Sequence, residues 1–155
     1  MIIETTAEDH SALTDGRAPR RCRLPDTPIA PPEILAMLAD VAANVRATFT
    51  PASWLIVHDD EVVGLCSITR PPQGGVVEIG YGVAPSRQGR GYASDAVMAI
   101  VRWARRDPKV AALVAETSVL NPASQQVLLH AGFDRVGERV DDEDGRLIVW
   151  RCDTL

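Results

Sequence analysis

The most informative stretch of this chain reads Arg87-Gln88-Gly89-Arg90-Gly91-Tyr92-Ala93. A predicted strand, Val76–Val83, precedes it, and Ala93 begins a segment whose apolar residues recur at helical spacing as far as Ala104. A helix N-terminus offers unpaired N–H groups and the positive end of the helix dipole, and glycines let a ligand come close to the backbone. The stretch therefore predicts an anion site suited to phosphates, with Arg87 or Arg90 adding positive charge. An ordinary glycine-rich turn is the alternative.

The spacing of these residues shows which known kinds of phosphate-binding loop the stretch does not match. A P-loop requires a Gly-Lys-Ser/Thr sequence, which the chain lacks. The dinucleotide fingerprint would begin at Gly80-Tyr81-Gly82, but Pro85 stands where its last glycine belongs. The pattern that remains is Gln-x-x-Gly-x-Ala, which runs from Gln88 to Ala93.

The rest of the chain predicts an α/β fold, in the order strand, helix, three strands, helix, strand, helix, two strands. The expected strands are Ile2–Thr6, Ser53–His58, Val62–Thr69, Val76–Val83, Val110–Val119, Asp134–Val140 and Leu147–Cys152. Helices are expected to begin at Pro32, Ala93 and Asn121-Pro122, and residues 15–32 are expected to be irregular. Glycines inside a strand, here Gly80 and Gly82, indicate a bulge or a close approach of another chain or a ligand to the backbone.

Composition places the chain among ordinary globular proteins. Its 155 residues suit one domain, residues 1–155, with 46% apolar and 24% charged residues. The net charge of −5 argues against nucleic acid as a partner. No apolar run approaches the roughly 20 residues that span a bilayer, and the first residues do not resemble a signal peptide, so we expect a cytoplasmic protein without a membrane partner. The cysteines Cys22, Cys66 and Cys152 are scattered, which predicts neither a disulfide framework nor a metal site.

Two segments resemble the GNAT superfamily of N-acetyltransferases. The stretch from Gln88 to Ala93 is similar to the pyrophosphate loop of that family, whose pattern is Arg/Gln-x-x-Gly-x-Gly/Ala. Asn121-Pro122-Ala123-Ser124, followed by Ala131-Gly132-Phe133, is similar to the family's Asn-x-x-Ser/Ala…Gly-Phe segment. Asn121 is also a good N-cap for a helix that begins at Pro122, and one residue can fill both roles.

The resemblance implies a fold and a division of the chain. It covers residues 53–152, the expected cofactor-binding core, whereas residues 1–50 are expected to shape the substrate side. The implied fold is a mixed, mostly antiparallel sheet of six to seven strands, flanked by about four helices. A splayed parallel pair, Val76–Val83 and Val110–Val119, would hold the cofactor. Homodimers are common in the family.

The cofactor implied by the resemblance is acetyl-CoA, as a cosubstrate. Its pantetheine would pair with the backbone of Tyr81 to Val83, and the Val83 N–H is the candidate oxyanion donor. The expected cofactor-binding residues are Tyr81, Gly82, Val83, Gln88, Gly89, Arg90, Gly91, Tyr92, Ala93, Ser94 and Asn121.

Acetyl transfer also needs a base, because an amine with a pKa of about 10.4 must lose its proton. Glu116 matches the position of a catalytic glutamate in the ribosomal-protein N-terminal alanine acetyltransferase branch of the family. Glu78 lies on the same strand face as Gly80 and Gly82. An apolar setting would raise the pKa of either carboxyl group into the range of a base, and the alternative for each is a structural acid paired with an arginine or a backbone N–H.

One departure from the family concerns the leaving thiolate. Many members have a tyrosine seven residues after the motif asparagine as general acid, and this chain has Leu128 there. Ser124 is the expected substitute, as in the ribosomal branch, unless the thiolate leaves unaided, which a thiol pKa of about 8.5 allows.

These residues together predict an enzyme that moves an acetyl group directly from acetyl-CoA to a primary amine of a small molecule or a protein N-terminus. Leu128 leaves open a non-catalytic acyl-CoA-binding or sensing domain. A nucleotide-binding module that uses Gly89 to Gly91, and a different acyl donor such as succinyl-CoA, are further alternatives.

Overall fold

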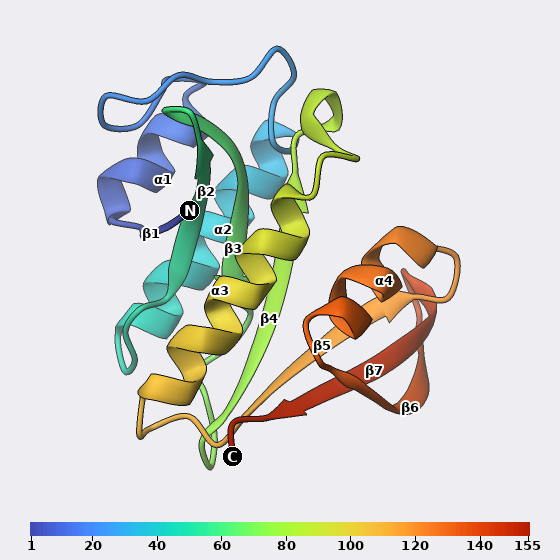
Figure 1. Ribbon diagram of the computed structural model, residues 1–155. Coiled ribbons are helices and arrows are strands. Elements are labelled where there is room, and N and C mark those ends of the chain that lie inside the picture. The colour runs from blue at the N-terminus through green and yellow to red at the C-terminus, as the bar shows by residue number, and fades with distance from the viewer.

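Seven strands form one mixed sheet in the computed structural model, which describes residues 1–155 (Figure 1). The strands are β1 Ile2–Glu4, β2 Ser53–His58, β3 Glu61–Ile68, β4 Val76–Val83, β5 Ala112–Ser118, β6 Asp134–Asp141 and β7 Gly145–Asp153. Their order is β1-β2-β3-β4-β5-β7-β6, and every neighbouring pair is antiparallel except β4 and β5. The expected mixed, mostly antiparallel sheet with one parallel pair is confirmed.

Four helices flank this sheet. They are α1 Ala7–Thr14, α2 Pro32–Arg46, α3 Tyr92–Arg106 and α4 Pro122–His130, with a short 3-10 turn, η1 Pro85–Arg87, before α3. Successive strand side chains point to opposite faces of the sheet. Leu55 packs with Leu13 of α1 and Leu35 of α2, whereas its neighbour Ile56 belongs to the core that includes Val97 of α3. Helices α1 and α2 therefore cover one face and α3 covers the other.

Helix α1 is absent from the order read from the sequence, and the expected strand Ile2–Thr6 ends at Glu4 instead. Thr6 caps the helix: its Oγ1 accepts a bond from the Asp9 N–H at 3.3 Å, and the Asp9 carboxylate accepts one from the Thr6 N–H at 2.8 Å. The side chains that α1 buries include the polar Asp9 and His10. A helix of eight residues without an apolar stripe gives no helical periodicity to detect.

The parallel pair is short, and beyond it the sheet opens. Strands β4 and β5 pair only over three residues each, Val76–Glu78 against Ala112–Val114. Figure 1 shows β5, β7, β6 and α4 leaning away from β4 and α3 past this point. The expected splayed parallel pair is confirmed. The pairing of β4 with β3 is regular through Gly80 and Gly82, so the bulge considered for these glycines is absent.

Candidate active site

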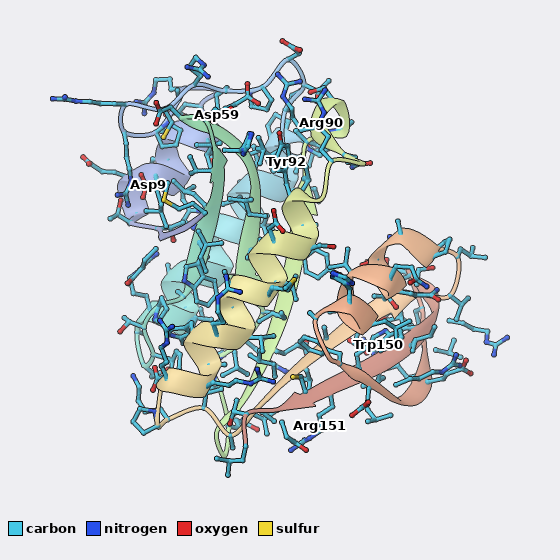
Figure 2. The ribbon with its side chains drawn as sticks, in the orientation of Figure 1. Asp9, Asp59, Arg90, Tyr92, Trp150 and Arg151 are labelled. Carbon is cyan, nitrogen blue, oxygen red and sulfur yellow. The ribbon has the colours of Figure 1, made fainter.

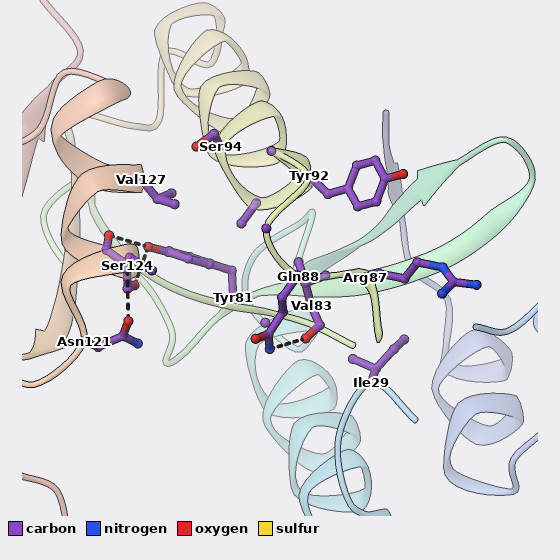
Figure 3. A pocket seen from close by; sticks show the side chains of 15 residues that line it. Ile29, Tyr81, Val83, Arg87, Gln88, Tyr92, Ser94, Asn121, Ser124 and Val127 are labelled. Carbon is purple, nitrogen blue, oxygen red and sulfur yellow. Dashed lines mark hydrogen bonds between the residues drawn. The ribbon is translucent and has the colours of Figure 1, made fainter. Parts of the chain in front are cut away.

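A cleft of about 480 Å³ opens where β4 and β5 diverge (Figure 3). Its walls come from the end of β4, from η1, from the first turn of α3 and from the start of α4. The lining residues are Ile29, Tyr81, Gly82, Val83, Arg87, Gln88, Gly89, Gly91, Tyr92, Ala93, Ser94, Asn121, Ala123, Ser124 and Val127. The structure therefore brings together all of the residues expected to bind the cofactor except Arg90.

The glycine loop forms one end of the cleft. Gly89 and Gly91 have φ values of 77° and 83°, a region that side chains other than glycine rarely adopt, and a Cβ on either would meet no atom within 4 Å. Gly91 is the N-cap of α3, and no side chain caps this helix. The N–H groups of the first turn, from Tyr92 to Ser94, are therefore free for a ligand. This end of the cleft fits a pyrophosphate.

Two neighbouring side chains hold this loop in place. Gln88 Nε2 donates to the Val83 carbonyl at 3.0 Å, which ties the loop to the end of β4. Arg87 is bound by Glu61, with Nε 2.5 Å from Oε1, and by Asp26 at 3.3 Å. The guanidinium expected to assist phosphate binding is thus already paired with carboxylates.

Arg90 lies outside the cleft. It is exposed on the loop between η1 and α3 and makes no ion pair (Figure 2). At this place Arg90 can add positive charge near the phosphate end of the cleft but does not line the cleft.

The backbone of β4 forms the second wall. In an antiparallel pair, residues that exchange two hydrogen bonds alternate with residues that exchange none. The Ala84 N–H donates to the Val63 carbonyl and the Thr69 N–H to the Glu78 carbonyl. In this register the peptide groups of Tyr81 and Val83 point away from β3 and toward the splay. Buried N–H and C=O groups need partners, and those facing the splay suit the amides of a pantetheine arm.

The start of α4 forms the third wall. Asn121 caps the helix, because its Oδ1 accepts a bond from the Ser124 N–H at 3.1 Å. The amide nitrogen of Asn121 donates to no protein group, so capping leaves it free for a ligand. The Tyr81 hydroxyl reaches across from β4 to within 2.8 Å of Ser124 Oγ (Figure 3). Burial raises the pKa of the Tyr81 phenol.

Both candidate bases lie outside the lining of this cleft. Strand alternation places Glu78 and Glu116 on the sheet face opposite to Tyr81. Glu78 accepts bonds from Arg70 at 2.5 Å and from Thr69 Oγ1 at 2.8 Å. The Glu116 carboxylate is paired with Arg139 of β6 through both of its oxygens. The expected apolar setting is wrong for both residues, because a guanidinium contacts each carboxylate.

Three lining residues were not expected from the sequence. Ile29 comes from the segment expected to be irregular, and nothing in its neighbourhood marks it. Ala123 and Val127 lie four residues apart on α4 and so share one helix face with Ser124. The motif asparagine and this spacing together would have indicated them.

Three other features of the chain bear on its chemistry: its potential metal ligands, its buried cysteine and the composition of its helices. No group of three His, Cys, Asp or Glu side chains is arranged to hold a metal ion. Burial raises the pKa of the Cys66 thiol to about 12, so this cysteine is a packing residue. None of the helices combines the length and apolar composition that crossing a bilayer requires.

The comparisons with known proteins agree with this geometry. Residues 2–134 match the family model of the acetyltransferase (GNAT) domain. Over 81 residues the chain is 35% identical to the ribosomal-protein-serine acetyltransferase of Escherichia coli (strain K12), a match covering 52% of this chain and 45% of that protein. It is 32% identical over 136 residues to the uncharacterized N-acetyltransferase YjdG of Bacillus subtilis (strain 168), covering 86% and 80%.

A solved structure extends the similarity to the whole fold. RimL, a ribosomal L7/L12 α-N-protein acetyltransferase in complex with coenzyme A, superposes with a TM-score of 0.72 at 21% identity. The match covers 98% of this chain and 92% of that one.

Proposed function

This chain belongs to the GNAT acetyltransferase family, and from that premise we propose that it transfers an acetyl group from acetyl-CoA to a primary amine of a small molecule or of a protein N-terminus. The supporting observation is the direction of the cleft. It runs from the free N–H groups of the glycine loop to two hydroxyl groups, those of Tyr81 and Ser124. In a phosphate-bearing acyl donor, the phosphates would thus contact the backbone N–H groups and the thioester would lie near the hydroxyl groups.

Acetyl-CoA supplies an activated carbonyl when it is bound, and the residues of this chain fit it. The N–H groups from Gly89 to Ser94 bind the pyrophosphate at the start of α3. The peptide groups of Tyr81 and Val83 pair with the pantetheine amides, and the Val83 N–H stabilises the negative charge that develops on the carbonyl oxygen. Contacts to the distant nucleotide position the reacting group.

The acceptor amine approaches from the face of the sheet that α3 leaves open. Helix α3 covers the Tyr81 face, whereas Gly80 and Gly82 leave the C-terminal half of β4 without side chains on the opposite face. Glu116 and Glu78 lie on this opposite face, and either accepts the proton of the amine directly or through water.

Ser124 serves the leaving group. Leu128, at the position where many family members have a tyrosine, is fully buried in the core and offers no donor. Ser124 lines the cleft four residues earlier on the same helix, and its hydroxyl is a hydrogen-bond donor for the thiolate.

The first experiment is a calorimetric titration of acetyl-CoA into the wild type and into Gly91→Glu. The glutamate adds bulk and negative charge at the phosphate site, so we expect the binding seen in the wild type to be lost. Gly145→Glu is the matched control, because Gly145 has a similar φ of 73° and open space around its Cα, and it lies in the β6–β7 turn outside the cleft lining. Equal binding by all three proteins, or by none, would contradict the proposed cofactor site.

The second experiment asks whether bound acetyl-CoA turns over. Thiol release is measured with peptide N-termini, polyamines and amino sugars as acceptors. Turnover with any of these amines rejects the non-catalytic acyl-CoA-binding alternative. Thermal stabilisation by ATP or NAD but not by CoA would favour the nucleotide-binding alternative. Faster thiol release from succinyl-CoA than from acetyl-CoA would show that the preferred acyl donor is not acetyl-CoA.

A further inference from the structure

Tyr81 makes the side-chain hydrogen bonds that connect β4 with α4 across the splay. Its hydroxyl lies 2.8 Å from Ser124 Oγ and 3.2 Å from the Ser124 carbonyl oxygen (Figure 3). Both residues line the cleft, at the end opposite the glycine loop. A phenol from one wall thus contacts the hydroxyl that the proposed reaction assigns to the leaving group.

The contact controls where the Ser124 proton can point. A serine hydroxyl has one proton to donate and two lone pairs that accept. If Ser124 donates to Tyr81, its proton is turned away from a ligand in the cleft. If Tyr81 instead gives its single proton to Ser124 Oγ, the shorter of its two contacts, and not to the Ser124 carbonyl oxygen, the Ser124 proton is free to point into the cleft. Burial raises the pKa of the Tyr81 phenol, which keeps it protonated as a donor at neutral pH.

We propose that Tyr81 is a positioning residue that donates to Ser124 Oγ and thereby directs the Ser124 proton to the sulfur of coenzyme A. The inference rests on the proposed acetyl transfer. In that reaction the amine nitrogen forms a bond to the carbonyl carbon, the C–S bond breaks, and sulfur leaves with the electron pair. The thiolate then accepts a hydrogen bond from Ser124, and the proton of the amine goes to the base. No proton leaves Tyr81.

This arrangement gives a physical reason for the tyrosine on β4. Helix α4 has Leu128 at the position where many family members have a tyrosine, so α4 itself offers no phenol. The phenol of this chain comes from the opposite wall of the cleft and acts through a serine. A tyrosine that serves only to tether β4 to α4 would give the same distances, so the test must read the electrostatics at the sulfur.

The test is the thiol pKa of bound coenzyme A, followed through the ultraviolet absorbance of its thiolate as pH rises. Donation to the charged form lowers a pKa. We expect the thiol bound to the wild type to titrate below the free value of about 8.5. Tyr81→Phe and Ser124→Ala should each move it back upward by about half a unit to one unit, and the double variant no further, since Tyr81 acts through Ser124.

Tyr92→Phe is the matched control, because it removes a hydroxyl that makes no hydrogen bond with the protein and keeps the backbone N–H through which Tyr92 is proposed to bind the cofactor. It should leave the thiol pKa unchanged. Turnover gives a second readout: Tyr81→Phe should lower kcat about tenfold while the KM for acetyl-CoA changes less than about twofold.

A further variant keeps the test decisive if Tyr81→Phe does not fold. The chain has two tyrosines, so fluorotyrosine incorporated into Tyr92→Phe replaces Tyr81 alone. Fluorination makes the phenol a stronger donor and should lower the thiol pKa further. If coenzyme A binds but its thiol pKa is insensitive to these changes, the positioning role is wrong and the proposed transfer stands. If the wild type does not bind coenzyme A, both fall.

Discussion

The two glutamates Glu78 and Glu116 share one face of the sheet, but only Glu116 lies beyond the paired positions of β4 and β5. Glu78 lies opposite Val114 in the last paired position of the parallel ladder. Glu116 lies two residues further along β5, where β5 no longer pairs with β4. An amine that reaches the thioester through the opening passes the unpaired segment, so we propose Glu116 in preference to Glu78 as the base.

Glu116→Gln should therefore lower kcat by about 100-fold, because the amide keeps the shape of the side chain but accepts no proton. The KM for acetyl-CoA should stay nearly constant, since the residue lies outside the cofactor cleft. Glu78→Gln is the control and should change kcat by less than about threefold. Steady-state kinetics over a range of pH check both, and the reverse ranking of the two variants would transfer the role to Glu78.

His10 predicts a pH dependence of stability that is separate from catalysis. Its side chain is buried, with Nε2 2.9 Å from Ser53 Oγ. Burial lowers the pKa of His10, and the charge of Arg46 lowers it further, while Asp9 acts in the opposite sense. The unfolded imidazole has a pKa of about 6.5, so below that pH the unfolded chain takes up a proton that the folded chain resists. The free energy of unfolding therefore decreases as the pH is lowered below about 6.5, by at most about 1.4 kcal/mol per pH unit from this group.

The matching experiment is urea unfolding of wild type and His10→Gln at pH values of about 7.5 and 5.5. The loss of stability between the two pH values should be smaller in the variant, because its side chain does not titrate. His130→Gln is the control, since His130 is exposed in the last turn of α4. Equal pH dependence in wild type and His10→Gln would contradict the role of the buried imidazole.

At the scale of elements, the loop before α2 is hydrogen-bonded to the turn that precedes the glycine loop. Ser86 of η1 exchanges bonds with Thr27: its N–H donates to Thr27 Oγ1 at 3.0 Å, and Thr27 Oγ1 lies 2.8 Å from Ser86 Oγ. Arg87 adds the ion pair to Asp26. The segment expected to shape the substrate side is thus bonded directly to the turn that precedes the glycine loop, and Ile29 of the same segment lines the cleft.

Thr27→Val should weaken acetyl-CoA binding by about two- to tenfold, the equivalent of one or two lost hydrogen bonds, because the turn is less well held before the ligand binds. Thr154→Val is the matched control, because its hydroxyl likewise makes two hydrogen bonds, here by donating to the carbonyls of Val110 and Ala111, at the far end of the chain. Calorimetry compares the two. Equal loss of affinity in both variants would show a general effect on stability instead of a local one.

The sequence predicted the elements whose periodicity is strong. The bounds of β2 and β4 and the start of α2 at Pro32 agree with the structure, because short apolar runs between turn residues and a proline at the first helical turn are local signals. The loop and motif segments likewise indicated most of the cleft lining. The Arg87 ion pair and the contact between Tyr81 and Ser124 were not predictable, because each joins residues far apart in the sequence. Such contacts depend on the tertiary fold and leave no local pattern.

At the scale of the whole molecule, a short ladder joins two halves of the sheet. Beyond the three paired positions of β4 and β5, the two walls of the cleft meet through the hydrogen bonds of Tyr81 and the packing of α3 with α4. The unpaired peptide groups of both strands face each other across the opening. A ligand that lies between them replaces the missing ladder, so its binding should stabilise the sheet as a whole.

Amide hydrogen exchange measured by NMR, with and without acetyl-CoA, tests this replacement residue by residue. The N–H groups of Tyr81 and Val83 face the splay and should exchange more slowly once the ligand is bound, because a pantetheine carbonyl accepts from Tyr81 and the thioester carbonyl accepts from Val83. The N–H of Gly82 between them faces β3, opposite Leu65, and should change little beyond the general gain in stability. Protection that rose equally at all three residues would mean that the ligand stabilises the fold without pairing with β4. Protection at Tyr81 and Val83 alone would show that the ligand lies between β4 and β5 and forms hydrogen bonds with the backbone of β4, as a neighbouring strand would.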